Sequence, residues 1–373
     1  MKTLDILDRL IGFPTVSKDS NLDLIDWVED LLKGADFEVT RIWSPDRQKA
    51  GLFARIGPRV EGGVCLSAHT DVVPVEGQNW TRPPFQLTME DGRVYGRGTT
   101  DMKGFLASAL ATAIQSRAYE KPLTLAISYD EEVGCTGIQH MLPEIAPRIG
   151  TPEIVIVGEP TSMRVATGHK GKMGLQVTCR GTPGHSAEAP HFTNAIHIAA
   201  AFVTEIRALQ EKIAAQTDPR YGVPYTTLHV GAIHGGRALN VVPDEVELAM
   251  EFRHLPDQNP ETLLAEITSA ARRVEGMFKD AEISFERRIS YPGFETSADA
   301  PAVSLLRSMQ GANDDMKVSY GTEAGFLASL GLTCAVIGPG EMTRDGHRPD
   351  EGLDIAQLES CDTFLEGLSQ RLL

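Results

Sequence analysis

The sequence lacks the paired cysteines that are typical of disulfide-stabilised proteins and of cysteine-ligated zinc sites. Its cysteines are scattered along 373 residues, are odd in number, and form no Cys-x-x-Cys pair. The five are Cys65, Cys135, Cys179, Cys334 and Cys361. This pattern argues against both a disulfide framework and a metal site built from thiolates. Cys65 and Cys334 lie within apolar stretches, so we expect them to be small core residues.

Long apolar runs and targeting signals are also absent. No run of apolar residues reaches the ~18–20 that a membrane-spanning helix needs. The N-terminal segment MKTLDILD carries acidic side chains, where a signal peptide would carry basic ones and then a long apolar stretch. We therefore expect a soluble cytoplasmic protein without a membrane partner.

Basic side chains are few relative to acidic ones. The chain has 35 Lys and Arg against 51 Asp and Glu, which gives a formal net charge of −16. It contains neither a block of Lys and Arg nor an alternation of basic and aromatic residues, so we expect no nucleic-acid partner. An acidic protein can attract a cationic substrate. Acidic surfaces are also common in soluble proteins, so the charge only excludes partners.

The sequence does contain alternating strand-like and helix-like segments, which are typical of an α/β fold. The length exceeds that of most single cores, so two domains are expected. Between about residues 173 and 288 the order becomes β-α-β-β-α-β, which is the ferredoxin-like pattern. The α/β order then resumes. We predict a discontinuous α/β domain at 1–171 and 287–373, with an α+β domain inserted at 172–286.

The longest predicted helix lies within this insert. It covers about 192–216 and places Ile196, Ala200, Val203 and Ile206 on one face, which we expect to be the buried one.

Five potential metal ligands follow predicted strands. Apolar runs precede three of them directly, and ligands gather at the carboxyl ends of strands in an open parallel sheet. The five segments are SAHTD (67–71), GTTDMKG (98–104), DEEVG (130–134), GEPT (158–161) and DGHRPD (345–350). Histidine and carboxylate side chains without cysteine form the usual ligand set of catalytic zinc and related sites. The sequence therefore suggests a metal site assembled across the sheet.

Taken singly, three of these candidates also have ordinary explanations. Asp71 can hydrogen-bond the second ring nitrogen of His69, because alternate positions of a strand end point the same way, but a histidine beside an acid is common on surfaces. Asp101 can bridge two ions or can cap the helix that follows it. His347 lies in a polar turn, where a lone histidine usually has no function.

The remaining candidates are carboxylates. The adjacent Glu131 and Glu132 would repel each other if both were buried without cations. One assignment of roles makes Glu132 a metal ligand and leaves Glu131 to take a proton from water. A solvated acidic turn explains them as well. Glu159 follows an apolar strand and precedes Pro160, which stops further strand pairing. A glutamate at the end of a buried strand is poorly explained as an ordinary surface residue.

Taken together, these motifs resemble a known family. Across its whole length the chain resembles the zinc-dependent M20 family of aminoacylases and carboxypeptidases. The segments that carry the resemblance are SAHTDVVP (67–74), GRGTTDMKG (96–104), DEEVG (130–134) and HRPDE (347–351). The resemblance implies a catalytic zinc-hydrolase domain with a mixed sheet, a ferredoxin-like lid and dimerisation domain, and a homodimer.

The resemblance also assigns roles to the candidates. It implies that Asp101 bridges two divalent ions, which we expect to be zinc, although cobalt or manganese would accept the same ligand types. One ion would be completed by His69 and Glu159, and the other by Glu132 and His347. Two further residues complete the set, Asp71 as the partner that orients His69 and Glu131 as the general base.

A closer likeness is to the deacetylating members of the family, through GEPT (158–161), GHKGK (168–172) and YGTEAG (320–325). It implies hydrolysis of an N-acyl amino acid, with N-acetylornithine of arginine biosynthesis as the expected small-molecule substrate. His185, in GTPGHSA (181–187), would stabilise the oxyanion, and Asn240, Arg253 and Thr322 would bind substrate. For Arg253, a strand-surface charge beside a glutamate is the alternative.

Other functions share this metal set. The alternatives are another N-acyl-amino-acid deacylase, a succinyl-diaminopimelate desuccinylase and a dipeptidase. A non-catalytic binding protein built on this fold would be expected to have lost a ligand or the base, and none of these residue types is missing here.

Overall fold

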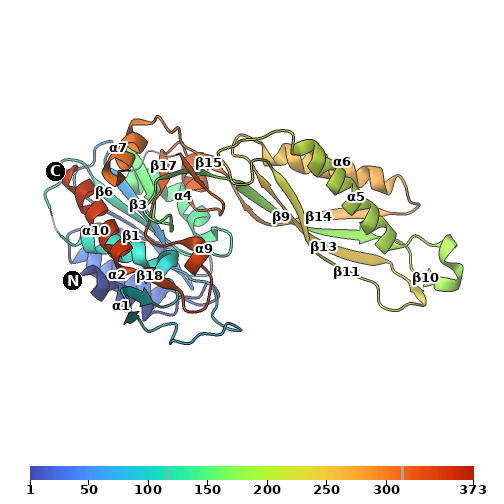
Figure 1. The fold of residues 1–373 in the computed structure, drawn as a ribbon, viewed down its shortest axis with the longest axis horizontal. Helices are drawn as coiled ribbons and strands as arrows, with labels where there is room; N and C mark the ends of the chain where they lie inside the picture. Colours follow the sequence, from blue (N-terminus) through green and yellow to red (C-terminus); the bar gives the residue numbers. More distant parts are fainter. Residues whose placement is uncertain (116, 312–314) are drawn as a thin grey trace. The chain divides into compact units, whose positions relative to one another are not determined.

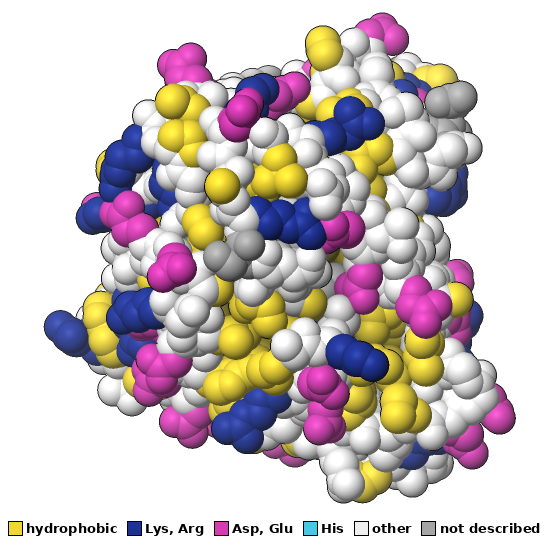
Figure 2. Space-filling view, turned by 90° about the vertical axis from the view of Figure 1, so that its left-hand side faces the viewer, with side chains coloured by type: hydrophobic (Ala, Val, Ile, Leu, Met, Phe, Trp, Pro, Cys, Tyr) yellow, Lys and Arg dark blue, Asp and Glu magenta, His cyan; other side chains and the backbone are white. Residues whose placement is uncertain are grey.

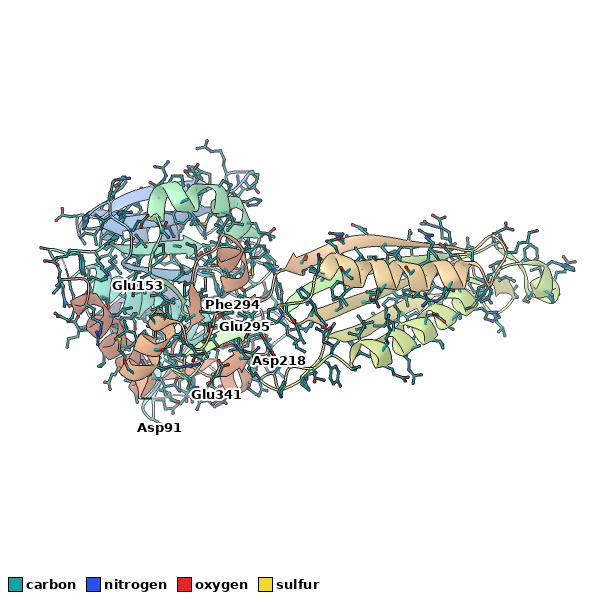
Figure 3. All side chains as sticks on the ribbon, turned by 90° about the horizontal axis from the view of Figure 1, so that it is seen from above. Asp91, Glu153, Asp218, Phe294, Glu295 and Glu341 are labelled. Carbon is teal, nitrogen blue, oxygen red and sulfur yellow. The ribbon has the colours of Figure 1, made fainter. Side chains whose placement is uncertain are left out.

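The computed structural model describes residues 1–115, 117–311 and 315–373, and it divides into two compact units. The first comprises Met1–Gly168, Phe294–Val318 and Thr322–Leu373, and the second comprises His169–Gly293 with Ser319–Gly321. Figure 3 labels Phe294, where the chain re-enters the first unit. The domain boundaries expected from the sequence stay a prediction.

The first unit is built on a nine-stranded mixed sheet in the order β1-β2-β6-β3-β7-β17-β8-β15, with β16 paired to β8. Its middle strands β6, β3, β7 and β17 run parallel, whereas β1 and β2 are antiparallel to their neighbours. The strands are β1 Glu38–Trp43, β2 Ala50–Ile56, β3 Val64–His69, β6 Leu123–Ser128, β7 Ile154–Val157, β8 Ala166–His169, β15 Phe294–Glu295, β16 Met316–Val318 and β17 Cys334–Val336. Parallel strands need both faces covered, and every residue of β3, β6 and β7 is buried.

Helices pack on both faces of this sheet. One face carries α1, α2, α3, α7 and α10, and its core includes alternate strand residues such as Leu66, Leu125 and Ile156. The other face contacts α4 and α8. The helices are α1 Thr3–Ile11, α2 Leu22–Lys33, α3 Gly104–Ala113, α4 Thr136–Ile149, α7 Pro301–Gln310, α8 Ala324–Ser329, α9 Met342–Asp345 and α10 Ile355–Gln370. Helix α3, at the centre of its layer, is rich in alanine and buried on all sides.

A small antiparallel sheet, β18-β5-β4, belongs to the same unit. Its strands are β4 Thr88–Glu90, β5 Arg93–Tyr95 and β18 Gly352–Asp354. It joins the segment before Asp101 to the segment after His347, because β5 pairs with β18.

The second unit has the order β9-α5-β11-β13-α6-β14, and its antiparallel sheet has the strand order β11-β13-β9-β14. This is the ferredoxin-like arrangement, with α5 and α6 on one face of the sheet (Figure 1). Its elements are β9 Gly171–Arg180, β10 Gly184–His185, η2 Ser186–His191, α5 Ala195–Ile213, β11 Thr227–Gly235, β12 Val241–Val242, β13 Glu245–His254, α6 Pro260–Glu275 and β14 Glu282–Tyr291. The predicted fold class, α/β with an inserted ferredoxin-like unit, is confirmed.

Of the face predicted for α5, only Ile206 is buried. Ile196 is 42% exposed, and the buried stripe runs through Ile198, Ala199, Phe202 and Ile206. Counted from the buried Ala195, Ile198, Ala199 and Phe202 follow the i, i+3, i+4, i+7 spacing of a buried helix face.

Two surface observations bear on the expected partners. Among the described residues, no helix is both long and apolar enough to cross a bilayer. On the face drawn in Figure 2, acidic and basic side chains are interspersed among apolar ones.

Candidate metal centre and active site

Three of the candidate ligand segments meet because their strands are parallel neighbours. His69 is the last residue of β3, Glu132 lies shortly after β6, and Glu159 lies shortly after β7. Strand β3 pairs in parallel with both β6 and β7, so the carboxyl ends of all three lie at one edge of the sheet. The strand-end prediction is correct for these residues.

The same prediction was wrong for the other two candidates. Asp101 lies in η1, Thr99–Lys103, a kinked turn that leads into α3 and in which Asp101 itself has non-helical backbone angles. His347 follows α9, a helix of four residues that is too short to show a helical period in the sequence. Asp101 is also not the cap of α3, because Lys103 holds that position.

The structure nevertheless brings all five candidates together around the carboxylate of Asp101. Its Oδ1 lies 3.2 Å from Nε2 of His69, and its Oδ2 lies 3.1 Å from Nε2 of His347. Oε1 of Glu159 is 3.6 Å from Nε2 of His69, and Oε2 of Glu132 is 3.0 Å from Nε2 of His347. Two groups, each with one imidazole and one glutamate, therefore share one aspartate.

Asp71 connects these groups to the segment that carries Glu131. Its Oδ1 accepts the main-chain N–H of Glu131 at 3.0 Å, and its Oδ2 accepts that of Glu132 at 3.3 Å. The Ser17 hydroxyl donates to Oδ2 at 2.7 Å. Nδ1 of His69 lies 2.9 Å from the Asp71 carbonyl oxygen and 3.4 Å from Oδ1. The carbonyl is thus the nearer partner of His69, and the carboxylate mainly fixes the glutamate loop.

Burial and mutual repulsion perturb the acids of the site. Burial, followed by the charge of Asp101, raises the pKa of Glu159 well above its ordinary value and that of Glu132 to about 7. Burial also raises the pKa of Glu131 strongly, and Glu132 adds to that shift. Hydrogen bonds to Asp101 and Glu132 raise the pKa of His347 to about 10. The carboxylates exceed the positive charge that two imidazoles can supply.

These residues fit a pair of divalent cations. Among the described residues, Oε1 of Glu132 and Oε1 of Glu159 are buried and have no hydrogen-bond partner. Ligand atoms of His69, Asp101 and Glu132 lie within 4.8 Å of one another, as do those of His69, Glu131 and Glu159. A set of imidazole nitrogens and carboxylate oxygens suits zinc and its neighbours. The His347 side chain is 49% exposed, so the centre is open on that side.

Sequence reasoning missed three residues around this centre. Glu323 is buried, and burial raises its pKa to about 7. The Cys135 thiol donates to Oε1 of Glu131 at 3.3 Å. Ser17 holds Asp71 as described above. Glu323 lies in YGTEAG, which carried the family likeness, but Ser17 and Cys135 have no motif that would have singled them out.

The substrate-binding candidates lie in different parts of the chain. His185 is exposed, its Nδ1 accepts the main-chain N–H of Ala187, and its backbone pairs with Val241, next to the exposed Asn240. Arg253 lies at the opposite end of β13, where its Nε donates to Glu251 at 2.9 Å. The contact with a neighbouring glutamate, which was the alternative to substrate binding for Arg253, is therefore present.

Thr322 belongs to the first unit and is fully buried. Its hydroxyl accepts the main-chain N–H of Ala324 at the start of α8.

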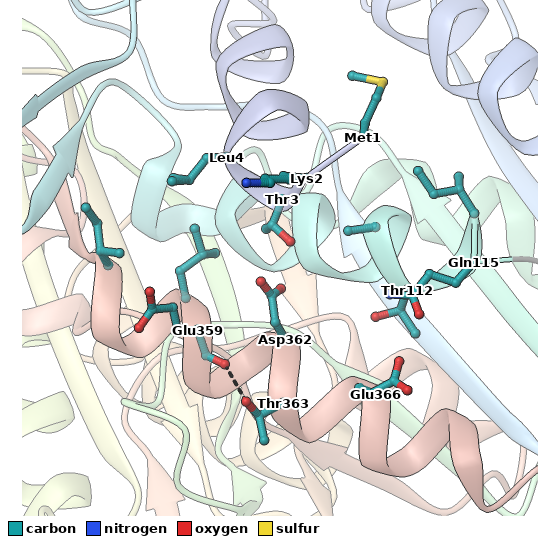
Figure 4. Close-up of a pocket in the computed structure, with 14 residues that line it drawn as sticks. Met1, Lys2, Thr3, Leu4, Thr112, Gln115, Glu359, Asp362, Thr363 and Glu366 are labelled. Carbon is teal, nitrogen blue, oxygen red and sulfur yellow. Dashed lines mark hydrogen bonds between the residues drawn. The ribbon is translucent and has the colours of Figure 1, made fainter.

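A cavity elsewhere in the first unit contains none of these residues. It has a volume of about 700 Å³ and lies between the ends of α1 and α3 and the side of α10. Glu359, Asp362 and Glu366 line it, and the Thr363 hydroxyl donates back to the Glu359 carbonyl (Figure 4). The cavity is distinct from the metal centre.

Comparisons with known proteins agree with this geometry. Residues 65–371 match the model of peptidase family M20/M25/M40. An acetylornithine deacetylase of Shigella sonnei is 34% identical over 364 residues, covering 94% of this chain and 92% of that protein. A second acetylornithine deacetylase, from Aliivibrio fischeri, is 33% identical over 377 residues, covering 98% of this chain and 97% of that protein.

Solved structures share the fold at low sequence identity. A tripeptidase from Staphylococcus aureus has a TM-score of 0.80 at 18% identity, covering 99% of this chain and 98% of that one. With the family match and the clustered histidine and carboxylate groups, these likenesses identify the chain as a metallohydrolase that belongs to the M20/M25/M40 peptidase family.

Proposed function

We propose that this chain hydrolyses the amide bond of N-acetylornithine, releasing ornithine and acetate in arginine biosynthesis. The observation that carries the amidohydrolase chemistry is the Asp101 carboxylate, whose two oxygens face two different imidazoles. The substrate is supported by two relatives at 34% and 33% identity over nearly the full length, both named acetylornithine deacetylase.

The proposed ligands are His69, Asp101 and Glu159 for one ion and Asp101, Glu132 and His347 for the other. When bound, two divalent cations, which we take to be zinc, would polarise the scissile carbonyl and lower the pKa of water.

Glu131 is the proposed general base. It lies within 4.8 Å of His69 and Glu159, and Cys135 and the Asp71 carboxylate hold it in place. It would take the proton from the attacking water and return it to the leaving amine.

Substrate recognition would need two copies of the chain. If Arg253 holds the α-carboxylate and His185 the oxyanion, both must reach one small molecule. Within the second unit, however, Arg253 lies near one end of β13, and His185 lies beyond the other end, beside Val241. From Glu245 to Arg253 that strand spans roughly 26 Å at about 3.3 Å per residue. We therefore propose a homodimer in which His185 acts in the partner's site, with Asn240 beside it and Thr322 contributed by the chain that holds the metals.

The base assignment is tested with Glu131→Gln. We expect wild-type metal content and a fall in kcat of roughly 10²–10⁴-fold, because the amide cannot accept the proton. The exposed Glu153→Gln is the matched control and should keep full activity. Wild-type turnover by Glu131→Gln would refute the role.

The substrate is tested with a panel of N-acetylornithine, N-succinyl-diaminopimelate, other acetylated amino acids, dipeptides and a tripeptide. We expect the highest kcat/KM with N-acetylornithine. Peptides are a real alternative, because a tripeptidase shares this fold. A higher kcat/KM for a peptide would move the chain to that group.

The shared site is tested by mixing two inactive variants, His185→Ala and Glu131→Gln. After exchange of subunits, random pairing should restore about one quarter of wild-type activity, since half of the dimers would hold one intact site. If the mixture stays inactive although mixed dimers form, His185 does not act in trans.

A further inference from the structure

A buried ion pair lies directly behind the metal centre. Arg97 and Glu351 are each only 1% exposed, and Nη1 of Arg97 donates to Oε2 of Glu351 at 2.7 Å. The two residues belong to the motifs GRGTTDMKG and HRPDE, but neither supplies a ligand or the base in the proposed function.

The Glu351 carboxylate holds the backbone that carries Asp101. Its Oε2 also accepts the main-chain N–H of Gly98 at 2.9 Å. Its Oε1 accepts those of Thr100 at 2.8 Å and Asp101 at 3.0 Å. Charge-assisted hydrogen bonds are stronger than neutral ones, so the orientation of Asp101 depends on Glu351.

Arg97 reaches in the other direction, to the backbone that carries His347. Its Nη2 donates to Oε1 of Gln78 at 2.6 Å, and Nε2 of Gln78 donates to the His347 carbonyl at 3.1 Å. Its Nη1 lies 3.3 Å from the Arg348 carbonyl. The guanidinium also stacks 5.0 Å from the Trp80 ring. His347 has a positive φ of 60°, a backbone conformation that is uncommon for residues other than glycine.

Stability alone explains this pair poorly. Removing two charges from water is costly, and apolar residues of similar volume are often no worse. What the pair does connect is specific, because its two branches end on Asp101 and His347. Nε2 of His347 lies 3.1 Å from Oδ2 of Asp101 and 3.0 Å from Oε2 of Glu132, so these two residues and Glu132 form one of the two groups.

We propose that Arg97 and Glu351 are positioning residues that fix Asp101 against His347 and so set the affinity of the cation site formed by Asp101, Glu132 and His347. This inference rests on the proposed two-cation function. The site formed by His69, Glu159 and Asp101 depends less on the pair, because β3 and β7 of the main sheet hold two of its ligands.

The test measures metal occupancy directly. Wild type, Glu351→Gln and Arg97→Lys are dialysed against buffers of defined free Zn²⁺, and bound zinc per chain is measured by mass spectrometry. Wild type should bind two ions. Each variant should keep one ion, while the second binds roughly 10–100-fold more weakly. Cobalt-loaded proteins should lose one component of the visible absorption spectrum.

Two further variants keep the result interpretable. Glu29→Gln removes a partly buried glutamate of α2 that pairs with Arg41 of β1 and has no role in the site, so this variant should bind two ions like wild type. Gln78→Ala leaves the ion pair intact but removes the bond to the His347 carbonyl, and should weaken the same ion more mildly. If Glu351→Gln does not fold, Gln78→Ala and Arg97→Lys decide the question.

The outcomes separate the two ideas. If wild type binds no zinc, the proposed function fails. If wild type binds two ions and the folded variants bind both with wild-type affinity, the inference fails and the function stands. An equal loss of both ions would also overturn the inference, because the ion pair would then stabilise the loops of both cation sites rather than one site.

Discussion

At the scale of single residues, Asp71 links the histidine of one cation group to the loop that carries the base. Its carboxylate accepts two main-chain N–H groups, from Glu131 and Glu132, and the Ser17 hydroxyl. An amide at this position would present N–H groups where only acceptors fit. For Asp71→Asn we expect kcat/KM to fall roughly 10–100-fold. Ser17→Ala, which removes one donor, should cost less. Steady-state kinetics on zinc-loaded proteins check both, and equal effects would contradict this account.

Gly158 is a second residue whose identity is fixed by its surroundings. A Cβ at this position would lie 1.9 Å from the Phe105 ring of α3. We expect Gly158→Ala to destabilise the protein by roughly 1–3 kcal/mol, as overpacking does, and to lower activity because Glu159 follows. A Cβ at Gly222 meets nothing within 4 Å, so Gly222→Ala should stay within about 0.5 kcal/mol of wild type. Urea unfolding of the two variants makes the comparison, and similar midpoints would contradict it.

Much of the candidate site could be predicted because short motifs carry its chemistry. His69, Asp101, Glu132, Glu159 and His347 were identified by residue type and motif and meet in space. Ser17 could not be found in this way, because only the fold brings it to Asp71, 54 positions further along the chain. The contact from Gln78 to His347 spans 269 positions and has the same cause.

At the scale of elements, the buried parallel strands were predictable and the exposed or very short elements were not. Strands β3, β6 and β7 are largely apolar runs, as expected where both faces are covered. The sequence does not predict strand β1, because its residues are only half-buried or exposed and show no alternation. The sequence also predicts helices over 104–118 and 300–312, and these ranges include residues 116 and 312, which lie outside the described part of the chain.

Helix α5 provides a test at this scale. Phe202 is fully buried against β9 and β13, whereas Ile196 is 42% exposed. Phe202→Ala should cost roughly 3–5 kcal/mol of unfolding free energy because it leaves a cavity. Ile196→Ala should cost less than about 0.5 kcal/mol. Chemical denaturation checks both values, and the reverse order would restore the face predicted from the sequence.

At the scale of the whole molecule, the metal centre should contribute to stability as well as chemistry. Without cations, the acids around Asp101 are buried together with raised pKa values. A ligand that binds only the folded state at 100 times its Kd stabilises it by about 2.7 kcal/mol. We expect a chelator to lower the melting temperature and added Zn²⁺ to restore it. Calorimetry measures the shift, and an unchanged melting temperature would argue against a resident metal.

The position of β17 has a consequence for how the chain is made. This strand lies between β7 and β8 in the main sheet, although both of those precede the second unit in the sequence and β17 follows it. During synthesis, β7 cannot pair with its parallel neighbour β17 until more than a hundred further residues have been translated. That takes on the order of ten seconds or more. His69, Asp101 and Glu159 have all left the ribosome by then, but His347 is still to come. All ligands of one cation group are therefore synthesised in the first half of the chain, whereas the last ligand of the other group emerges only with the last tenth of the chain.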